Sequence, residues 1–128
     1  MAPMRVTVST SDAPTAIGPY SQAVKHGGLL WCSGQLGLRP GSGDLVADDT
    51  GAQTRQALSN LAAVCSEAGT SLGKALRLTV YLVDLGDFQA MNQVYATFFE
   101  APYPARVTIQ VTALPKGGRV EIEAVVAL

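Results

Sequence analysis

The residues best suited to chemistry lie in two alternating stretches near the C-terminus. Arg106 follows Tyr103-Pro104-Ala105 at the start of one stretch, and Glu121 and Glu123 lie in the other. A guanidinium offers a planar fork of donors that matches a carboxylate, and a glutamate can orient a water molecule or carry a proton. The pair predicts a site for a small anion. Residue type alone nevertheless favours Arg106 as a strand arginine paired with a glutamate, and Glu121 as part of a polar strand face.

Three further places could contribute contacts to a ligand. Tyr20 leaves a Gly-Pro bend and could supply a hydroxyl group or a wall. Ser33 and Gly34 end an apolar strand, where a glycine lets a ligand approach the backbone. Asn92 interrupts the apolar face of a predicted helix and could form a hydrogen bond with a neighbouring loop. The structural alternatives, a half-buried strand residue for Tyr20 and ordinary turn chemistry for Ser33 and Gly34, stay open.

The sequence offers little material for metal or covalent chemistry. His26 is the single histidine, so there is no histidine pair for zinc and no convincing Ser-His or Cys-His arrangement. The two cysteines, Cys32 and Cys65, lie in apolar stretches and are expected in the core. We therefore expect chemistry without a metal or cofactor.

The elements that must position these residues follow from periodicity. Alternation predicts strands at 4–9, 21–25, 29–33, 75–84, 106–111 and 119–128. Helical spacing predicts helices at 50–68 and about 85–100, and Thr50-Gly-Ala-Gln53 fits a capping box at the start of the first. The order is β-β-β-α-β-α-β-β, with the last two strands as expected neighbours.

Two helices can cover one face of a sheet, which predicts a single α+β domain over residues 1–128. The predicted core face contains Val107, Ile109 and Val111 of one closing strand and Val120, Ile122, Ala124 and Val126 of the other. The opposite face then contains Arg77, Thr79, Tyr81, Arg106, Thr108, Gln110, Glu121 and Glu123. Because this face is mixed rather than simply charged, we expect another subunit to bury part of it.

Composition limits the function classes. The 128 residues are 48% apolar and 15% charged, with a net charge of −1, which excludes disorder and gives no electrostatic reason to bind nucleic acid. The apolar runs are too short to span a membrane, and the N-terminus lacks the apolar block of a signal peptide. We expect a soluble, cytoplasmic protein.

Several short motifs together resemble the RidA (YjgF/L-PSP) family of reactive-intermediate deaminases. The motifs cover nearly the whole chain in order: Ile17-Gly-Pro-Tyr20-Ser-Gln22, Ser33-Gly-Gln35, Asp84-Leu-Gly-Asp-Phe88 with Asn92 and Phe98-Phe99, Pro104-Ala-Arg106, Leu114-Pro-Lys116 and Val120-Glu-Ile-Glu123-Ala124. The resemblance implies a chorismate mutase-like fold and a homotrimer whose sheets form a central barrel, with sites between subunits. It also implies a cofactor-free hydrolase of the 2-iminobutanoate/2-iminopropanoate deaminase type.

Such enzymes convert the imines and enamines that pyridoxal-phosphate enzymes release into 2-oxo acids and ammonia. By this resemblance Arg106 would bind the substrate carboxylate, Tyr20, Ser33 and Gly34 would line the cleft, and Glu121 would position the attacking water. Thr108 departs from the pattern, because many family members have a cysteine there.

Two competing functions remain. The departure at Thr108 favours a non-catalytic binding module for 2-oxo acids or related small carboxylates, in which Arg106 would serve in the same way. Some family members are described as ribonucleases or translation inhibitors, but near-neutral charge and a single histidine argue against that function here.

Overall fold

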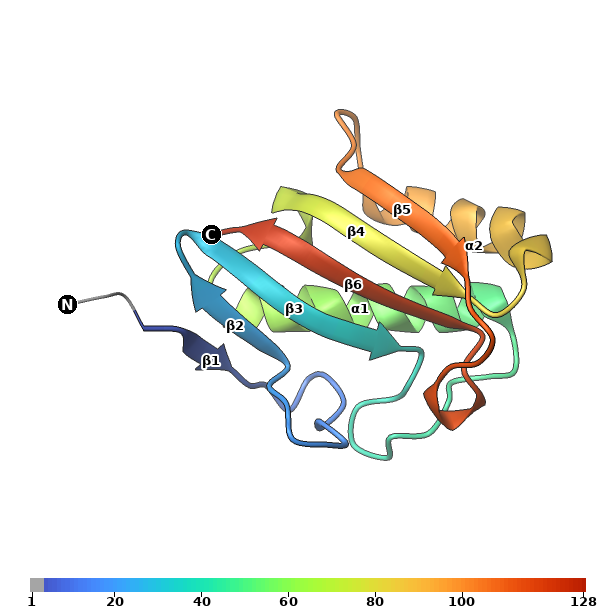
Figure 1. Ribbon diagram of the computed structural model, residues 1–128, viewed down its shortest axis with the longest axis horizontal. Helices are drawn as coiled ribbons and strands as arrows, with labels where there is room; N and C mark the ends of the chain where they lie inside the picture. The colour runs from blue at the N-terminus through green and yellow to red at the C-terminus, as the bar shows by residue number, and fades with distance from the viewer. Residues whose placement is uncertain (1–3) are drawn as a thin grey trace.

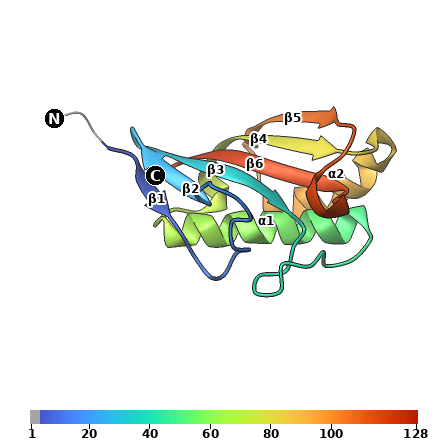
Figure 2. The same cartoon turned by 60° about the horizontal axis from the view of Figure 1, so that its bottom comes forward.

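The computed structural model describes residues 4–128 as a six-stranded sheet with two helices on one face (Figures 1 and 2). The helices are α1 (Thr50–Glu67) and α2 (Phe88–Tyr95). The strands are β1 (Val6–Val8), β2 (Ala23–His26), β3 (Leu29–Leu36), β4 (Ala75–Leu82), β5 (Ala105–Gln110) and β6 (Val120–Ala127). This arrangement confirms the predicted element order and the mixed α+β class. The helix predicted over 85–100 is α2 with a short 3₁₀ turn at each end, Leu85–Asp87 and Ala96–Phe98.

The strand order is β1-β2-β3-β6-β4-β5, so β6 lies in the middle of the sheet. It pairs antiparallel with both β3 and β4, whereas β4 and β5 pair in parallel through the α2 crossover. The prediction that the last two strands are neighbours is therefore wrong, because β4 separates them. A parallel partner needs a helical crossover, and that crossover moves β5 outward to the edge beside β4.

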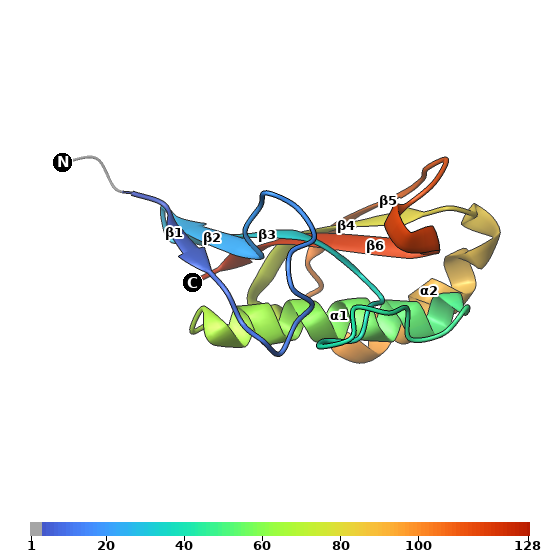
Figure 3. The ribbon, with the colours of Figure 1, turned by 90° about the horizontal axis from the view of Figure 1, so that it is seen from below.

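The core lies between the helices and the centre of the sheet, and Figure 3 shows α1 running along that face. Leu58, Leu61 and Val64 of α1 are fully buried against the sheet. The facing strand residues are also buried: Leu78, Val80, Leu82, Val120, Ile122, Ala124 and Val126. Cys32 and Cys65 are buried free thiols, as expected. Neither helix within residues 4–128 has the length and apolar character needed to cross a membrane.

The edge strand β5 turns its faces the opposite way from the prediction. Its parallel register sets Arg106 opposite Leu78 and Thr108 opposite Val80, so both polar side chains share the helix face. Val107 and Ile109 lie on the outer face and are 46% and 42% exposed. Alternation reveals that a strand has two kinds of face but not which one turns inward. At this edge α2, not the apolar stripe of α1, covers the inner face.

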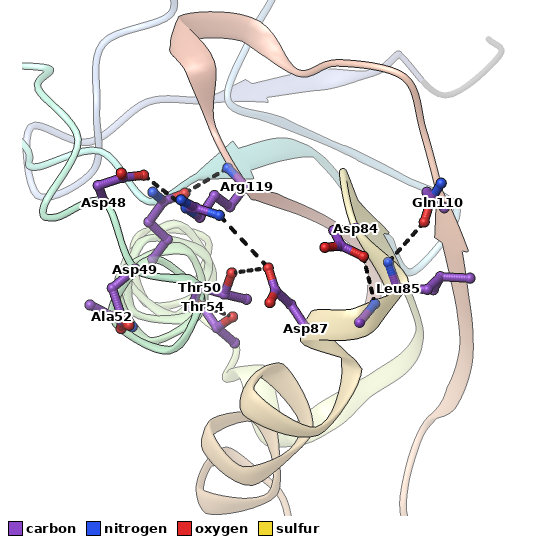
Figure 4. Close-up of polar contacts among 12 residues, drawn as sticks. Asp48, Asp49, Thr50, Ala52, Thr54, Asp84, Leu85, Asp87, Gln110 and Arg119 are labelled. Atoms are coloured by element: carbon purple, nitrogen blue, oxygen red, sulfur yellow. Dashed lines mark hydrogen bonds and ion pairs between the residues drawn. The ribbon is translucent and has the colours of Figure 1, made fainter.

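A polar cluster joins the starts of α1, α2 and β6 (Figure 4). Asp49, not Thr50, caps α1 by accepting a hydrogen bond from the Ala52 amide at 2.8 Å. The Thr50 hydroxyl donates instead to Asp87 at the start of α2, also at 2.8 Å. The predicted capping box is therefore wrong, because Thr50 is already inside the helix. Arg119 donates through Nε to Asp48 at 2.8 Å and fixes the chain just before β6.

Gln53 completes this cluster from inside the protein. Its side chain is fully buried, donates to the Ala47 carbonyl and accepts from the Arg119 amide, each at 2.8 Å. The first turn of α1 thereby sets the position at which β6 enters the sheet. Glu121 follows two residues later, so its place on the strand depends on this anchor.

Candidate functional site

The Arg106 guanidinium is held by α2 rather than by an acidic side chain. Its Nη1 donates to Asn92 Oδ1 at 2.7 Å, and its central carbon lies 4.6 Å from the Tyr95 ring centroid and 5.5 Å from that of Phe88. Positions 88, 92 and 95 fall on one face of a helix, which aims all three side chains at β5. An amide oxygen and two aromatic faces fix the fork but leave its positive charge unneutralised.

This environment contradicts the expected pairing of Arg106 with a glutamate. The ion pairs formed by residues 4–128 involve Arg119 and not Arg106. Burial raises the pKa of the Tyr95 hydroxyl, although the nearby Arg106 charge opposes the shift, so the stacked ring stays neutral. Asn92, expected to contact a loop, bonds strand β5 instead. Arg106 is thus a preoriented cation with no carboxylate partner among the described residues.

A cavity of about 360 Å³ opens beside this guanidinium. We call its lining the arginine site: Asn92, Tyr95, Ala96, Tyr103, Pro104 and Arg106. Tyr103 is 66% exposed, so the site opens to the surface. Thr108 shares the inner face of β5 two residues beyond Arg106. The volume and charge suit the carboxylate end of a small molecule.

Glu121 lies on the other face of the sheet, directly over Gly34. A Cβ atom at Gly34 would come within 2.5 Å of Glu121 Oε2, so the observed conformation of the Glu121 side chain requires a glycine at this strand position. The β3–β6 register is irregular between Cys32 and Gln35, at the point where the two residues meet. Burial, and secondarily the charge of Glu123, raise the pKa of Glu121. A carboxyl group that holds its proton more tightly than usual suits general acid–base chemistry.

Ser33 and Gln22 bring Tyr20 to Glu121. The Ser33 hydroxyl donates to the Ser21 carbonyl at 2.6 Å, and the Ser33 amide donates to the Gln22 carbonyl at 2.9 Å. Tyr20, Gly34 and Glu121 line a cavity of about 60 Å³ together with Ile17, Leu36 and Pro115. We call these six residues the glutamate pocket. The Ser33 hydroxyl is occupied by the backbone, so the side chain holds the loop rather than facing the cavity.

The sequence did not reveal the role of Gln22. Its buried side chain donates to the Pro14 and Thr10 carbonyls, at 2.8 and 3.1 Å, and accepts from the Thr10 amide at 2.7 Å. These bonds fold the loop before Tyr20 against β2. The available signal was a polar side chain within the strand predicted at 21–25, but a single position cannot reveal which groups it would bond. The stacking of Tyr95 and Phe88 on Arg106 was likewise missed, because both rings lie on the helix face that was expected to be apolar.

One copy of the chain does not bring the two sets of residues together. Arg106 is on the helix face of β5, whereas Glu121 is on the outer face of β6, with β4 between the two strands. The prediction that Arg106 and Glu121 share a polar face is therefore wrong within one chain. Among residues 4–128, no three histidine, cysteine, aspartate or glutamate side chains gather as a metal ion would require.

Comparisons with known proteins cover almost the whole chain. The family model described as Endoribonuclease L-PSP matches residues 10–128. The RutC family protein y4sK of Sinorhizobium fredii is 53% identical over 121 residues, which cover 94% of this chain and 96% of that protein. The 2-iminobutanoate/2-iminopropanoate deaminase of Capra hircus is 48% identical over 122 residues, covering 95% and 89%. The crystal structure of RidA from an Antarctic Psychrobacter superimposes with a TM-score of 0.92 at 45% identity, covering 96% and 99%.

Proposed function

Because the chain belongs to the RidA (L-PSP) family, we propose that it hydrolyses reactive 2-imino and 2-enamino acids to 2-oxo acids and ammonia in the cytoplasm. The observation that carries this proposal is Arg106, a cation oriented by Asn92 and Tyr95 and left without a carboxylate partner among the described residues. A substrate carboxylate would supply the missing charge. The relatives named as imine deaminases, at 48% identity for the goat protein, support this substrate class.

We further propose that the complete site forms between two copies of the chain in a homotrimer. The arginine site and the glutamate pocket lie on opposite faces of one sheet, so a carboxylate on Arg106 cannot meet Glu121 of the same copy. Val107, Ile109 and Trp31 expose 42–46% of their surface on the outer face and would provide apolar contact area. The expected result of light scattering is a mass of three chains, and a monomer would contradict the shared site.

The residues suggest a reaction sequence. The substrate carboxylate would bind Arg106, and Glu121 of the neighbouring copy would orient a water molecule toward the C=N carbon. Addition of water gives a carbinolamine, and transfer of a proton to nitrogen expels ammonia and leaves the 2-oxo acid. Thr108 would contribute a hydroxyl near the bound carboxylate. The protein would act by positioning and by stabilising charge rather than through a covalent intermediate.

The test measures ammonia release from freshly generated 2-iminopropanoate. We expect wild type to accelerate release and Arg106→Ala to lower kcat/KM by about a hundredfold or more, since the carboxylate loses its partner. Arg106→Lys keeps the charge without the fork and should be intermediate. Arg55→Ala, an exposed arginine of α1, is the matched control and should behave as wild type. A trimeric wild-type protein that does not accelerate release would refute the proposal for this substrate.

A non-catalytic binding module remains the second candidate, and Thr108 is the observation that favours it. The residue lies beside Arg106 on the inner face of β5, where many relatives are expected to have a thiol. Calorimetry with pyruvate or 2-oxobutanoate separates the two functions when combined with the turnover assay. Binding that depends on Arg106 without turnover would support the module.

Cleavage of RNA, suggested by the name of the family model, has weaker support. The net charge is −1, and the single histidine, His26, ends strand β2. RNA degradation that persisted in Arg106→Ala after nuclease-free purification would revive this function.

A further inference from the structure

Two carboxylates and a tyrosine form a network on the outer face of the sheet. Glu121 and Glu123 alternate along β6 and therefore point to the same side. On β4, Tyr81 pairs with Glu121 in register and Thr79 pairs with Glu123. The Tyr81 hydroxyl nevertheless reaches diagonally and donates to Glu123 Oε1 at 2.9 Å. Tyr81 thus lies beside one carboxylate and restrains the other.

The charged groups around Glu121 are few. Glu123 is its neighbour on β6, and Arg77 lies farther along β4, where it pairs with Val125. Gly34 of β3 has no side chain, and β5 presents Val107 and Ile109 on this face. Tyr20 is the titratable residue that the loop before β2 contributes to the pocket. In the proposed trimer, Arg106 of another copy would lie near Glu121 with the substrate carboxylate bound to it. The positive charge of the guanidinium and the negative charge of the substrate would then largely cancel.

Tyr81 is suited to remain a hydrogen-bond donor to Glu123 at neutral pH. Burial, the hydrogen bond to Glu123 and the charge of Glu123 raise the pKa of the Tyr81 phenol, so it keeps its proton at neutral pH. Burial and the Glu123 charge act in the same direction on Glu121. A carboxylic acid is most effective as a general acid when its pKa lies close to the working pH.

We propose that Glu123 and Tyr81 are positioning residues for the hydrolysis at Glu121. Tyr81 holds the Glu123 carboxylate near Glu121, and this fixed negative charge favours the state in which Glu121 carries a proton for the imine nitrogen. The inference rests on the proposed function and adds the source of the proton.

The proton balance closes within the site. Glu121 gives its proton to the imine nitrogen as the water oxygen bonds to carbon, and the resulting carboxylate takes a proton from that oxygen. Glu121 then protonates the amine of the carbinolamine. As the C–N bond breaks and ammonia leaves, the hydroxyl proton returns to Glu121 while the C=O bond forms. The acid is thus regenerated in each turnover.

The first experiment removes the negative charge of Glu123 while keeping the size and shape of its side chain. The pH dependence of kcat for 2-iminopropanoate is compared between wild type and Glu123→Gln. Because protonated Glu121 is the active form, the alkaline limb of the profile should move to lower pH by about half a unit for carboxylates roughly 7 Å apart. Glu67→Gln is the matched control, since it makes the same change at an exposed position of α1. It should leave the limb in place.

The second experiment asks whether Tyr81 acts through Glu123. Tyr81→Phe should shift the limb in the same direction by a smaller amount, because Glu123 keeps its charge but is released. In a Glu123→Gln background, Tyr81→Phe should add no further shift. Additive shifts would overturn the coupling.

A direct titration separates this inference from the proposed function. Carboxyl-carbon NMR of the assembled protein, without substrate, should show Glu121 losing its proton at lower pH in Glu123→Gln than in wild type. If this shift occurs but wild type releases no ammonia, the proposed function fails while the coupling of the carboxylates stands. If wild type is active and Glu123→Gln changes neither the titration nor the pH profile, the inference is overturned.

Discussion

Asn92 explains why Arg106 keeps its charge available. An amide oxygen accepts the guanidinium hydrogen bond at 2.7 Å without contributing a negative charge. A carboxylate in the same place would form an ion pair and compete with the substrate. The choice between these two nearly isosteric side chains therefore decides whether the arginine can bind an anion.

We predict that Asn92→Asp weakens substrate binding. The added carboxylate should raise KM by roughly tenfold or more while leaving the fold intact, because Asn92 is exposed. Steady-state kinetics and the thermal midpoint would be measured together. Gln93→Glu adds the same charge at the next exposed position of α2 and serves as the control. Equal effects in both variants would show a general charge effect instead of an ion pair.

Glu121 should make the protein less stable as the pH rises. The folded protein raises its pKa above the ordinary value of 4.5, so its contribution to stability is complete below that pH and is lost as the pH rises through the folded pKa. Glu121→Gln should therefore be more stable than wild type at pH 8 and no more stable at pH 4. Chemical denaturation at fixed protein concentration measures this difference. A wild type that is the more stable protein at pH 8 would contradict the direction.

For single residues, the sequence could identify the functional groups of the site but not the side chains that contact them. The donor fork of Arg106 and the carboxylate of Glu121 follow from residue type. The rings of Tyr95 and Phe88 reach Arg106 only because α2 returns over β5, and no local pattern encodes that contact. Gln22 was missed for the same reason, since its partners lie 8 and 12 residues earlier in the chain.

Among the secondary-structure elements, β3 has an irregular stretch at Gly34, and this stretch leaves room for the Glu121 carboxylate of the glutamate pocket. A methyl group there would meet the end of the flexible Glu121 side chain, whereas one at Gly37 would lie 2.6 Å from the Gln53 Cα. The two glycines of one segment therefore face different obstacles. The Glu121 side chain next to Gly34 can rotate away, whereas the Gln53 backbone next to Gly37 is buried and cannot.

Gly34→Ala should lower activity more than stability. The new methyl group displaces the Glu121 carboxylate, so kcat should fall at least about tenfold with a small change in thermal midpoint. Gly37→Ala should instead destabilise the protein strongly, because the Gln53 backbone cannot move aside. Kinetics and thermal unfolding of both variants test this contrast. An active Gly34→Ala protein would show that Glu121 tolerates displacement.

Element order was predictable, but the neighbours of the two closing strands and the inward face of β5 were not. Period-2 alternation and helical spacing predicted β-β-β-α-β-α-β-β, which the fold confirms. The position of β6 between β3 and β4 depends on pairing across the whole chain. For β5, the same alternation is compatible with either face inward, and its place at the edge beside α2 reverses the expectation.

For the whole molecule, the separation of Arg106 from Glu121 makes a quantitative prediction. Arg106→Ala and Glu121→Gln should each be inactive alone, but an intact arginine site of one variant can meet an intact glutamate pocket of the other. In the proposed homotrimer, random mixing of the two variants by co-expression should recover about a quarter of the wild-type sites. Ammonia release measures the recovery, and native mass spectrometry verifies mixing.

The outcome distinguishes the two possible arrangements of the site. If both residues act within one copy, the mixed trimers remain inactive. The sequence led us to expect a partner surface because the predicted outer face was mixed rather than simply charged, although β5 contributes Val107 and Ile109 to that face instead of Arg106 and Thr108. The sequence could therefore suggest an assembly, but only the strand faces show why a single copy separates the two groups.

The central position of β6 also has a consequence for folding of the protein. Strands β1, β2 and β3 form one ladder and β4 and β5 form another, and β6 supplies the pairing that joins them. Until β6 has paired, β3 and β4 each have an open edge, so a partly folded chain without β6 in place would hold two unconnected sheets. Such edges invite pairing with other chains. The risk of aggregation is therefore expected to be greatest in folding intermediates in which β6 has not yet joined the two ladders.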